Sequence, residues 1–211
     1  MANATANYGL VPVRYLGGPG GLPQNIECVV AAGYGASILY VGDPVILAGS
    51  GDPGTGMPTV QIAVGAEGSP SENLFGTIMG VSAEGPDSLN VLGSPVSTRS
   101  ILQVCPFLPG LILRINHKTS GSASASAISL NDIGRGKDLR LGAGDALTGK
   151  SGWVMDDTTG DATTGTQLRL IAFDDRTDNE FSSTVSTDTA NVDCLVVVAQ
   201  SFWYSDMGAG I

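Results

Sequence analysis

The sequence has few charged side chains and no long apolar run. Asp, Glu, Lys and Arg make up 14% of the 211 residues, whereas an ordinary soluble domain has about 25%. The ten basic residues are scattered and the net charge is −10, so the clustered Lys and Arg that bind nucleic-acid phosphates or anionic membranes are missing. No apolar stretch approaches the roughly 20 residues that cross a bilayer, and the opening MANATANYGL lacks the pattern of a signal peptide. We therefore expect neither nucleic acid nor a membrane as a partner.

Histidine and cysteine are also scarce. The single histidine, His117, stands beside Lys118 at the edge of a Ser/Ala-rich stretch, which predicts an exposed position outside any catalytic triad. The three cysteines, Cys28, Cys105 and Cys194, are far apart and have no CxxC spacing. This pattern predicts buried thiols rather than disulfides or a zinc site. No catalytic residue, metal or cofactor is expected.

Glycine is abundant, with 30 residues, and short β-branched runs cut by Gly and Pro fill the chain. The runs predict strands at 25–32, 37–41, 44–48, 59–64, 74–83, 100–105, 111–116, 166–173 and 192–199. Gly76 and Gly80, four residues apart in one run, predict a bend or bulge there. No segment keeps the i, i+3, i+4, i+7 apolar spacing of a helix over three turns. The sequence therefore predicts an all-β fold, either a β-barrel or a jelly-roll-like sandwich.

A polar stretch divides the predicted strands into two blocks. Residues 1–25, which include GGPGGLP, have turn and extended chemistry without a period and are interpreted as an extended N-terminal arm. Residues 26–116 form the barrel or sandwich body, in which PFLPG (106–110) is a hairpin-like corner. Residues 117–137 are interpreted as a Ser/Ala/Gly-rich loop or linker. Residues 138–211 are a second β segment, either separate or completing the same body, and no internal repeat is evident.

The eight residues GDALTGKS (144–151) match the phosphate-binding pattern GxxxxGK[ST] letter for letter. A working phosphate loop places its Lys and Ser at the start of a helix whose N-terminal amides face the phosphates. The residues that would form this helix, SGWVMDDTTGDATTG, contain three glycines, four threonines and three aspartates, which together disfavour a helix by more than about 6 kcal/mol. The match is therefore interpreted as a Gly-flanked turn with Lys150 exposed, leading into a strand at 152–156. The alternative is a nucleotide-binding site. It is favoured by the apolar strand that ends at Asp174, where a nucleotide enzyme would hold magnesium.

Acidic and aromatic clusters provide no ready-made site. Neighbouring acids at 156–157 and 174–175 would point to opposite faces of a strand, so neither pair is an acid/base couple. The run DDRTDNE (174–180) begins with the acid spacing of a calcium loop but lacks the glycine and the distal glutamate that complete one. A loosely held surface cation is the remaining alternative there. The triplet FWY (202–204) follows an apolar strand and predicts a core position or a subunit contact.

The chain resembles head decoration, or cement, proteins of tailed bacteriophages in four stretches: MANATANYGLVPVR (1–14), YVGDPVILAGSGD (40–52), TGKSGWVMDD (148–157) and LRLIAFDDRTDNE (168–180). The resemblance implies a protein made in the host cytoplasm that binds the major capsid protein on the outside of an HK97-type shell after the shell expands. It therefore implies a place in the virion, on the capsid exterior. Self-association as a homodimer or homotrimer is expected, because a low charge density fits a chain that buries surface in subunit and capsid contacts.

The expected contact surface is the N-terminal arm, whose apolar residues fit the addition of a strand to a neighbour or to the shell. The interface residues predicted on this basis are Tyr8, Leu10, Val11, Pro12, Val13, Arg14 and Tyr15. A disordered terminus is the alternative for this segment. The expected function is non-enzymatic: the protein binds an expanded head and stabilises it by bridging capsid subunits. The alternatives are a tail or fibre module, or a β-barrel enzyme that acts on a polysaccharide.

Overall fold

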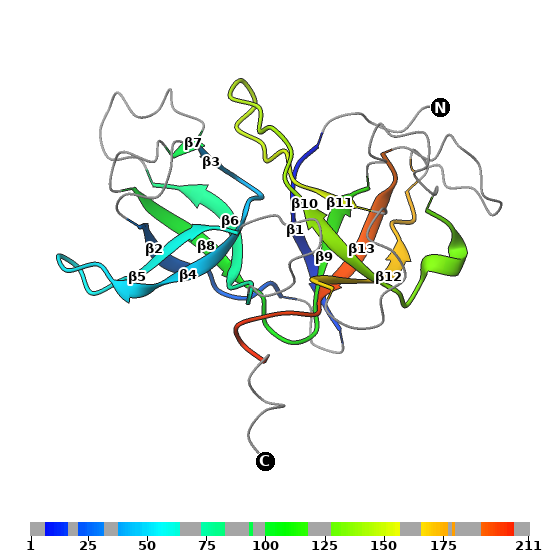
Figure 1. Cartoon of the computed structure of the whole chain (residues 1–211), viewed down its shortest axis with the longest axis horizontal. Helices are drawn as coiled ribbons and strands as arrows, with labels where there is room; N and C mark the ends of the chain where they lie inside the picture. Colours follow the sequence, from blue (N-terminus) through cyan, green and yellow to red (C-terminus); the bar gives the residue numbers. More distant parts are fainter. Residues whose placement is uncertain are drawn as a thin grey trace, which may run out of the picture.

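A computed structural model describes the chain at residues 7–16, 21–31, 38–63, 73–82, 93–94, 100–117, 128–156, 166–176, 179 and 191–204. These residues form strands and one short 3-10 helix, η2 (Leu130–Asp132), and there is no α-helix among them. The all-β prediction is confirmed. The strands fall into two units that lie side by side along the longest axis of the molecule (Figure 1).

The first unit is a closed five-stranded barrel with the strand order β2-β5-β4-β6-β8. Its strands are β2 (Ile26–Val30), β4 (Pro44–Gly51), β5 (Pro58–Ile62), β6 (Gly76–Val81) and β8 (Ile101–Pro106). All neighbours are antiparallel except β2 and β5, which are parallel. A two-stranded ribbon of β3 (Leu39–Tyr40) and β7 (Gly93–Ser94) stands beside the barrel.

The second unit is a six-stranded antiparallel sheet with the order β1-β9-β13-β12-β10-β11. Its strands are β1 (Val11–Tyr15), β9 (Leu111–Asn116), β10 (Gly136–Arg140), β11 (Val154–Asp156), β12 (Leu168–Phe173) and β13 (Asp193–Val198). The sheet curls until its last strand reaches the end of β9. There, Met155 of β11 forms a parallel bridge with His117, the residue that follows β9.

The two units repeat one topology. In chain order, the first strand of each unit (β2 or β9) pairs antiparallel with the fifth (β8 or β13) and lies parallel to the third (β5 or β11). The second strand (β4 or β10) pairs with the third and the fourth, and the fourth (β6 or β12) pairs with the fifth. The molecule is therefore a tandem of two barrel-like units, with β1 added to the second.

The agreement extends to single residues. Ile78 faces Val104 in the first unit as Leu170 faces Val196 in the second, and both ladders shift register directly after this pair. The bulge that was predicted in 74–83 is thereby confirmed, and it recurs at the equivalent place in the second unit. A β-bulge bends its strand and increases the local twist. The fourth strand of each unit, β6 or β12, therefore bends at the equivalent position.

Two glycines hold equivalent positions before the second strand of each unit. The Gly42 N–H donates to the carbonyl oxygen of Ile78, and the Gly134 N–H donates to that of Leu170, both at 2.8 Å. Gly42 has a φ of 96° and Gly134 a φ of 86°, which a side chain strongly disfavours. Both units therefore require glycine at this position. Most other equivalent positions carry different residues in the two units, so the repeat is not evident from the sequence.

Each unit has its own apolar core. The first core contains Cys28, Val30, Leu39, Val45, Val60, Phe75, Ile78, Leu102 and Val104. The second is larger and includes Leu10, Leu113, Ile115, Leu139, Trp153, Met155, Leu168, Leu170, Cys194 and Val196, and it extends to Ala63, Leu74 and Cys105 of the first unit. Trp203 packs against both cores. The cores therefore meet at the contact between the units.

The boundary between the units differs from the one that the sequence suggested. The chain passes from the first unit to the second between Pro106 and Leu111, so β9 belongs with the later strands and not with the body at 26–116. The stretch 106–110 is a crossover between the units rather than a hairpin-like corner, because β8 and β9 are not paired with each other. Within the interval 117–137, η2 and the start of β10 are ordered elements, and residues 118–127 lie outside the described part.

The N-terminal segment is extended, and it lies on the chain's own second unit. In β1, Val11 is opposite Arg114 and Tyr15 is opposite Leu111 of β9. Leu10, just before the strand, is fully buried in the core of this unit. An arm that leaves the body would expose this leucine and one edge of β9 to water, and pairing within the chain removes both costs.

Candidate functional site

The phosphate-loop match forms a hairpin turn between β10 and β11. The Asp145 N–H donates to the Lys150 carbonyl (3.0 Å), and the Gly149 N–H donates to the Asp145 carbonyl (2.8 Å). The carboxylate of Asp145 accepts hydrogen bonds from the Leu147 N–H (2.8 Å) and the Thr148 hydroxyl (2.9 Å). Lys150 is exposed, and a strand rather than a helix follows. The interpretation of GDALTGKS as a turn is confirmed.

The first unit contains the same turn between β4 and β5. There, the Asp52 N–H donates to the Met57 carbonyl and the Gly56 N–H donates to the Asp52 carbonyl, both at 2.8 Å. The Thr55 hydroxyl donates to the Asp52 carboxylate (2.6 Å). The glycines of the two turns have φ values of 72° and 67°. The shared pattern GDxxTG is therefore the signature of one structural turn, and the phosphate-loop match arises because Lys and Ser follow its second occurrence.

The N-terminal segment contacts both units where they meet. We call this region, where Tyr8 to Leu10, Val41 to Asp43 and Gly149 to Ser151 contact one another, the joint. The Leu10 N–H donates to the Gly42 carbonyl (2.9 Å), and the Leu10 carbonyl accepts a hydrogen bond from the buried Thr77 hydroxyl (2.9 Å). A Cβ on Gly9 would collide with the carbonyl oxygen of Gly42, and a Cβ on Gly42 would collide with that of Tyr8. Glycine is therefore required at both positions by the close approach of the two backbones.

The hairpin of the second unit reaches the same joint. The Val41 N–H donates to the Gly149 carbonyl (3.2 Å), and the Ser151 N–H donates to the Val41 carbonyl (3.0 Å). Asp43 lies buried beside them and accepts hydrogen bonds from the Tyr40 N–H (2.8 Å) and the Ser151 hydroxyl. Burial raises the pKa of Asp43 to about 6, against the opposing effect of these two hydrogen bonds. The joint thus contains a carboxyl that titrates well above its usual range.

The C-terminal segment makes a second contact between the units. The Leu74 N–H donates to the Gln200 carbonyl (3.1 Å), and the Phe202 N–H donates to the Leu74 carbonyl (2.9 Å). The indole N–H of Trp203 donates to the Phe75 carbonyl (2.9 Å), and the two rings are 5.2 Å apart. Trp203 is half-buried and packs against both cores, in agreement with the predicted core position, whereas Phe202 is 45% exposed and Tyr204 is half-buried.

A charged cluster attaches the start of the N-terminal segment to the second unit. The Tyr8 hydroxyl donates to the carboxylate of Asp193, which also pairs with Arg176. The guanidinium of Arg114 lies 5.3 Å from the centre of the Tyr8 ring and 3.3 Å from the carboxylate of Asp174. Burial raises the pKa of the Tyr8 phenol well above its usual value, so the hydroxyl remains a donor. The two acids are committed to these partners, and the cluster acts as an anchor for the N-terminus.

Asp174, Arg176 and Asn179 of the run DDRTDNE contribute to this anchor. The side-chain amide of Asn179 donates to the carbonyls of Asp174 (2.8 Å) and Asp193 (2.9 Å), and its oxygen accepts the Asp193 N–H (2.8 Å). Asn179 thereby ties the end of β12 to the start of β13. Among the residues that the structure describes, no group of His, Cys, Asp or Glu could hold a metal ion. Asp157, Thr177, Asp178 and Glu180 lie outside those residues.

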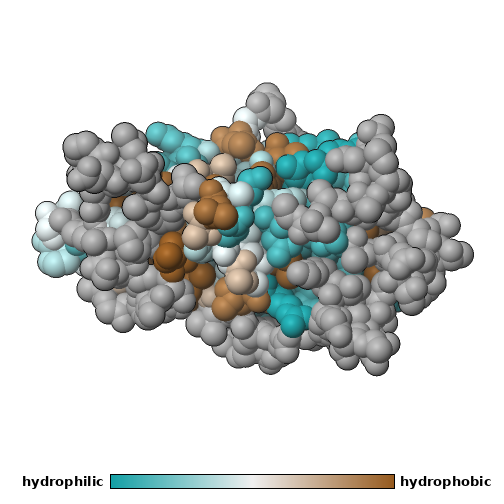
Figure 2. Space-filling model, turned by 90° about the horizontal axis from the view of Figure 1, so that it is seen from above, coloured by the Kyte–Doolittle hydropathy of each residue, from teal (hydrophilic) through white to brown (hydrophobic). Residues whose placement is uncertain are grey.

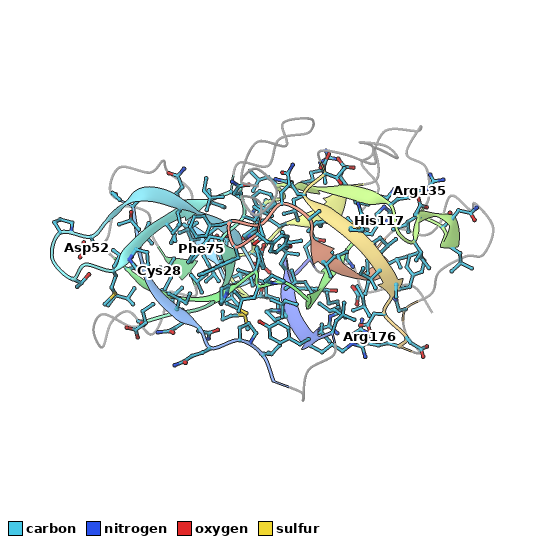
Figure 3. All side chains as sticks on the ribbon, turned by 90° about the horizontal axis from the view of Figure 1, so that it is seen from below. Cys28, Asp52, Phe75, His117, Arg135 and Arg176 are labelled. Carbon is cyan, nitrogen blue, oxygen red and sulfur yellow. The ribbon has the colours of Figure 1, made fainter. Side chains whose placement is uncertain are left out.

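The prediction that His117 is exposed is wrong. Its side chain is fully buried, and its backbone N–H donates to the Val192 carbonyl (2.7 Å) where the sheet curls round to β11. The Ser/Ala-rich stretch begins directly after His117, and its composition indicates an exposed position. The curled sheet nevertheless covers His117 (Figure 3). The prediction of buried, free thiols is confirmed for all three cysteines. Burial raises the pKa of Cys28 and Cys105 to about 11, which keeps both thiols protonated and unreactive.

The seven predicted interface residues lie on or just before β1. Leu10 and Pro12 are buried within the chain, and Val13 and Arg14 are exposed. The others, which are partly buried, are Tyr8, Val11 and Tyr15. Among these seven residues, Val13 and Arg14 are therefore the side chains most available to a partner.

No protein-family model, curated protein or solved structure matches the chain. Within the described ranges, the molecule has no helix with the length and apolar character needed to cross a membrane.

Proposed function

We propose that this protein is a non-enzymatic decoration, or cement, protein that binds the outer surface of an expanded phage head and stabilises it by bridging capsid subunits. The observation that supports this most is where the resembling stretches lie. Parts of 1–14, 40–52 and 148–157 meet at one joint and hold two barrel-like units together, and the described part of 168–180 anchors the N-terminus there. The residues that carry the resemblance thus help to join the two units into one body.

A two-unit body suits a bridging role. Backbone hydrogen bonds join the units at the N-terminal segment and again at the C-terminal segment, so a load on one unit is transmitted to the other. Each unit can contact a different subunit of the major capsid protein in an HK97-type shell. Modest contacts of this kind multiply when one body spans several subunits, without any single strong site.

The composition fits the same role. A net charge of −10 keeps the protein from binding packaged nucleic acid and favours a position on the virion exterior. The low fraction of charged residues fits burial of surface against the shell and against further copies in a homodimer or homotrimer.

Co-sedimentation with purified heads tests the proposal. Expanded empty heads from the phage that encodes the chain are mixed with a series of protein concentrations, and unexpanded proheads serve as the control. We expect saturable binding to expanded heads, and decorated heads should withstand a higher temperature than bare ones. Binding to neither form would overturn the proposal and favour a tail or fibre module.

A further inference from the structure

The edge of β9 that receives β1 has a counterpart in the first unit. By register, Ile112 and Arg114 of β9 correspond to Asn25 and Glu27, at the start of β2 and just before it. Strand β1 pairs with both of the β9 residues. Among the residues that the structure describes, no strand pairs with their counterparts on the same side of β2, and both counterparts are exposed. The position that β1 fills on the second unit is therefore open on the first, and we call residues 24–27 the β2 edge.

The backbone groups of the β2 edge can be assigned to two sides. The Val30 N–H donates to the Ser100 carbonyl beside β8 (3.2 Å), whereas the Ala31 N–H donates to the Val60 carbonyl of β5 (2.9 Å). Successive residues of a strand direct their backbone groups to opposite neighbours. The odd-numbered residues of this strand therefore face the side of β5.

Proline ends the ladder between β2 and β5 before it reaches this edge. The two parallel strands pair at 29–30 with 59–60. At this register, the next donor, for the carbonyl of Glu27, would be the N–H of residue 58, which is Pro58 and has none. Within the described ranges, the backbone groups that the β2 edge turns to this side thus have no partner strand, as a site for strand addition requires.

The side chains of the β2 edge are polar, and its charge is opposite to that of the β9 edge. Figure 2 shows apolar side chains gathered between the two units, whereas the β2 edge has Gln24, Asn25 and Glu27. The carboxylate of Glu27 accepts a hydrogen bond from the side-chain amide of Gln103 (2.9 Å) and stands where β9 has Arg114. Opposite charges directly across a pair of strands stabilise the pair. The strand that fits this edge therefore carries Lys or Arg opposite Glu27.

We propose that the β2 edge receives an extended, basic segment of the major capsid protein as an added antiparallel strand; this inference rests on the proposed function. The ladder of β1 on β9 gives the geometry of the addition. In such additions, main-chain hydrogen bonds provide the affinity and the side chains opposite provide the specificity, so the site needs no apolar patch.

A second copy of this chain fits the β2 edge less well. The strands that the structure describes are already paired within the chain, so a second copy would have to pair edge to edge. Pairing of two β2 edges would place two Glu27 carboxylates on one short ladder, which like charges destabilise. A basic segment instead complements both Glu27 and the net charge of −10.

The first test separates the backbone of the edge from its side chains. Asn25→Pro removes an N–H that faces the added strand, whereas Asn25→Ala keeps it. Co-sedimentation with expanded heads should show binding weakened about tenfold or more for Asn25→Pro, and binding within about twofold of the unaltered protein for Asn25→Ala. Urea denaturation of the free proteins establishes that both variants fold, and sedimentation velocity gives their oligomeric states.

Charge reversal provides a second test that leaves the backbone intact. Glu27→Arg installs the residue of the equivalent position on β9, and Asp175→Arg makes the same change in net charge at an exposed acid of the second unit. We expect binding to expanded heads to weaken about fivefold for the first and by less than about twofold for the second. Hydrogen exchange detects the added strand itself, because the amides of Asn25 and Glu27 should exchange about tenfold or more slowly on heads than in the free protein.

The outcomes separate this inference from the proposed function. If Asn25→Pro and the unaltered protein bind heads equally well, or if neither amide is protected on heads, the β2 edge is not the docking site, while the cement role stands. If Asn25→Pro does not fold, equal binding by Glu27→Arg and Asp175→Arg overturns the inference in the same way. If the unaltered protein binds no heads, the proposed function fails and this inference fails with it. If the variants instead lower the oligomeric state of the free protein, the edge pairs with a second copy and its assignment to the capsid protein is overturned.

Discussion

The first and second units share strand order, register and a β-bulge, yet different interactions stabilise them. The first is a closed barrel whose β2–β5 pair completes the ring. The second is closed by one bridge at His117 and takes β1 as an added strand. Arg114 and Asp193, which carry the charged cluster of the second unit, correspond by register to Glu27 and Ile101 in the first. A topology can therefore be kept while its polar interactions are rebuilt.

The comparison shows which features belong to the fold and which to this molecule. Positive-φ glycines before the second strand and the GDxxTG turn occur in both units, so they are requirements of the topology. The Tyr8 anchor and the buried Asp43 occur in one unit each, and both lie at or near the joint. Substitutions at equivalent residues of the two units test which features are required by the topology and which are specific to the joint.

The largest expected effect is at the glycine of the joint. Gly42→Ala and Gly134→Ala both place a side chain at a positive φ, which costs about 1–2 kcal/mol. Only the first also collides with a backbone, since a Cβ on Gly134 meets nothing within 4 Å. We expect Gly42→Ala to lower the free energy of unfolding by about 3 kcal/mol or more, measured by urea denaturation. Equal losses in the two variants would show that the joint does not depend on close approach.

The next effect is a pH dependence confined to the joint. The folded-state pKa of Asp43 is about 6, raised from its ordinary 3.8, so the folded protein holds this proton more tightly than the unfolded chain. The contribution of Asp43 to stability is therefore greatest below pH 4, falls as the pH rises to about 6, and decreases by up to about 3 kcal/mol in total. The equivalent position in the second unit is Arg135 and has no such effect.

Asp43→Asn isolates this contribution, because other groups titrate equally in both proteins. Urea midpoints are measured from pH 4 to 8 for the variant and the unaltered protein. The variant should lose less stability over this interval. Parallel curves for the two proteins would contradict the assignment to Asp43.

A smaller effect is expected at the N-terminal anchor. Tyr8→Phe removes the hydroxyl that donates to Asp193 and leaves a buried carboxylate with one partner fewer, at a cost of about 1.5–3 kcal/mol. Tyr15→Phe, seven residues later on β1, keeps its ring on the core and should change stability by less than about 0.5 kcal/mol. Thermal unfolding followed by circular dichroism compares the two, and equal melting temperatures would show that the cluster contributes little.

The smallest effect distinguishes the twin turns. Asp52 is buried and accepts bonds from the Gly54 N–H, the Thr55 N–H and the Thr55 hydroxyl, whereas Asp145 is exposed. We expect Asp52→Ala to cost about 1–2 kcal/mol and Asp145→Ala to cost less. Urea denaturation measures both, and a larger loss for Asp145→Ala would mean that the turn at the joint supports more than its own hairpin.

Much of the fold could be predicted from local patterns. The runs 100–105 and 111–116 correspond to β8 and β9 within one residue, because a β-branched apolar run between Gly or Pro residues indicates a strand wherever it pairs. The identity of the partner strand is not a local property. Nothing near Val11 indicates that it pairs with Arg114, and the extended chemistry of the segment suits an arm and a strand equally.

The joint and the repeat could not be predicted for a related reason. The turn at GDALTGKS was predicted from its unfavourable helix composition, but its twin has different residues at every variable position, and a further GDATTG at 160–165 lies outside the described residues. The close approach of Gly9 to Gly42 and the burial of Asp43 depend on backbones that are distant in the chain. Sequence patterns indicate a turn that favours glycine at Gly9 and Gly42, but they do not show which backbone atom a side chain there would collide with.

The pairing of β1 with β9 also sets an order of events during synthesis. The first strand leaves the ribosome about 100 residues before its partner, which at about 5–20 residues per second leaves it unpaired for roughly 5–20 seconds. The whole first unit, from β2 to β8, is made in this interval and has every strand it needs to close. Meanwhile, Pro12 and Arg14 make β1 a poor template for a wrong partner. Strand β1 is therefore made before the first unit and is among the last strands to reach its final place.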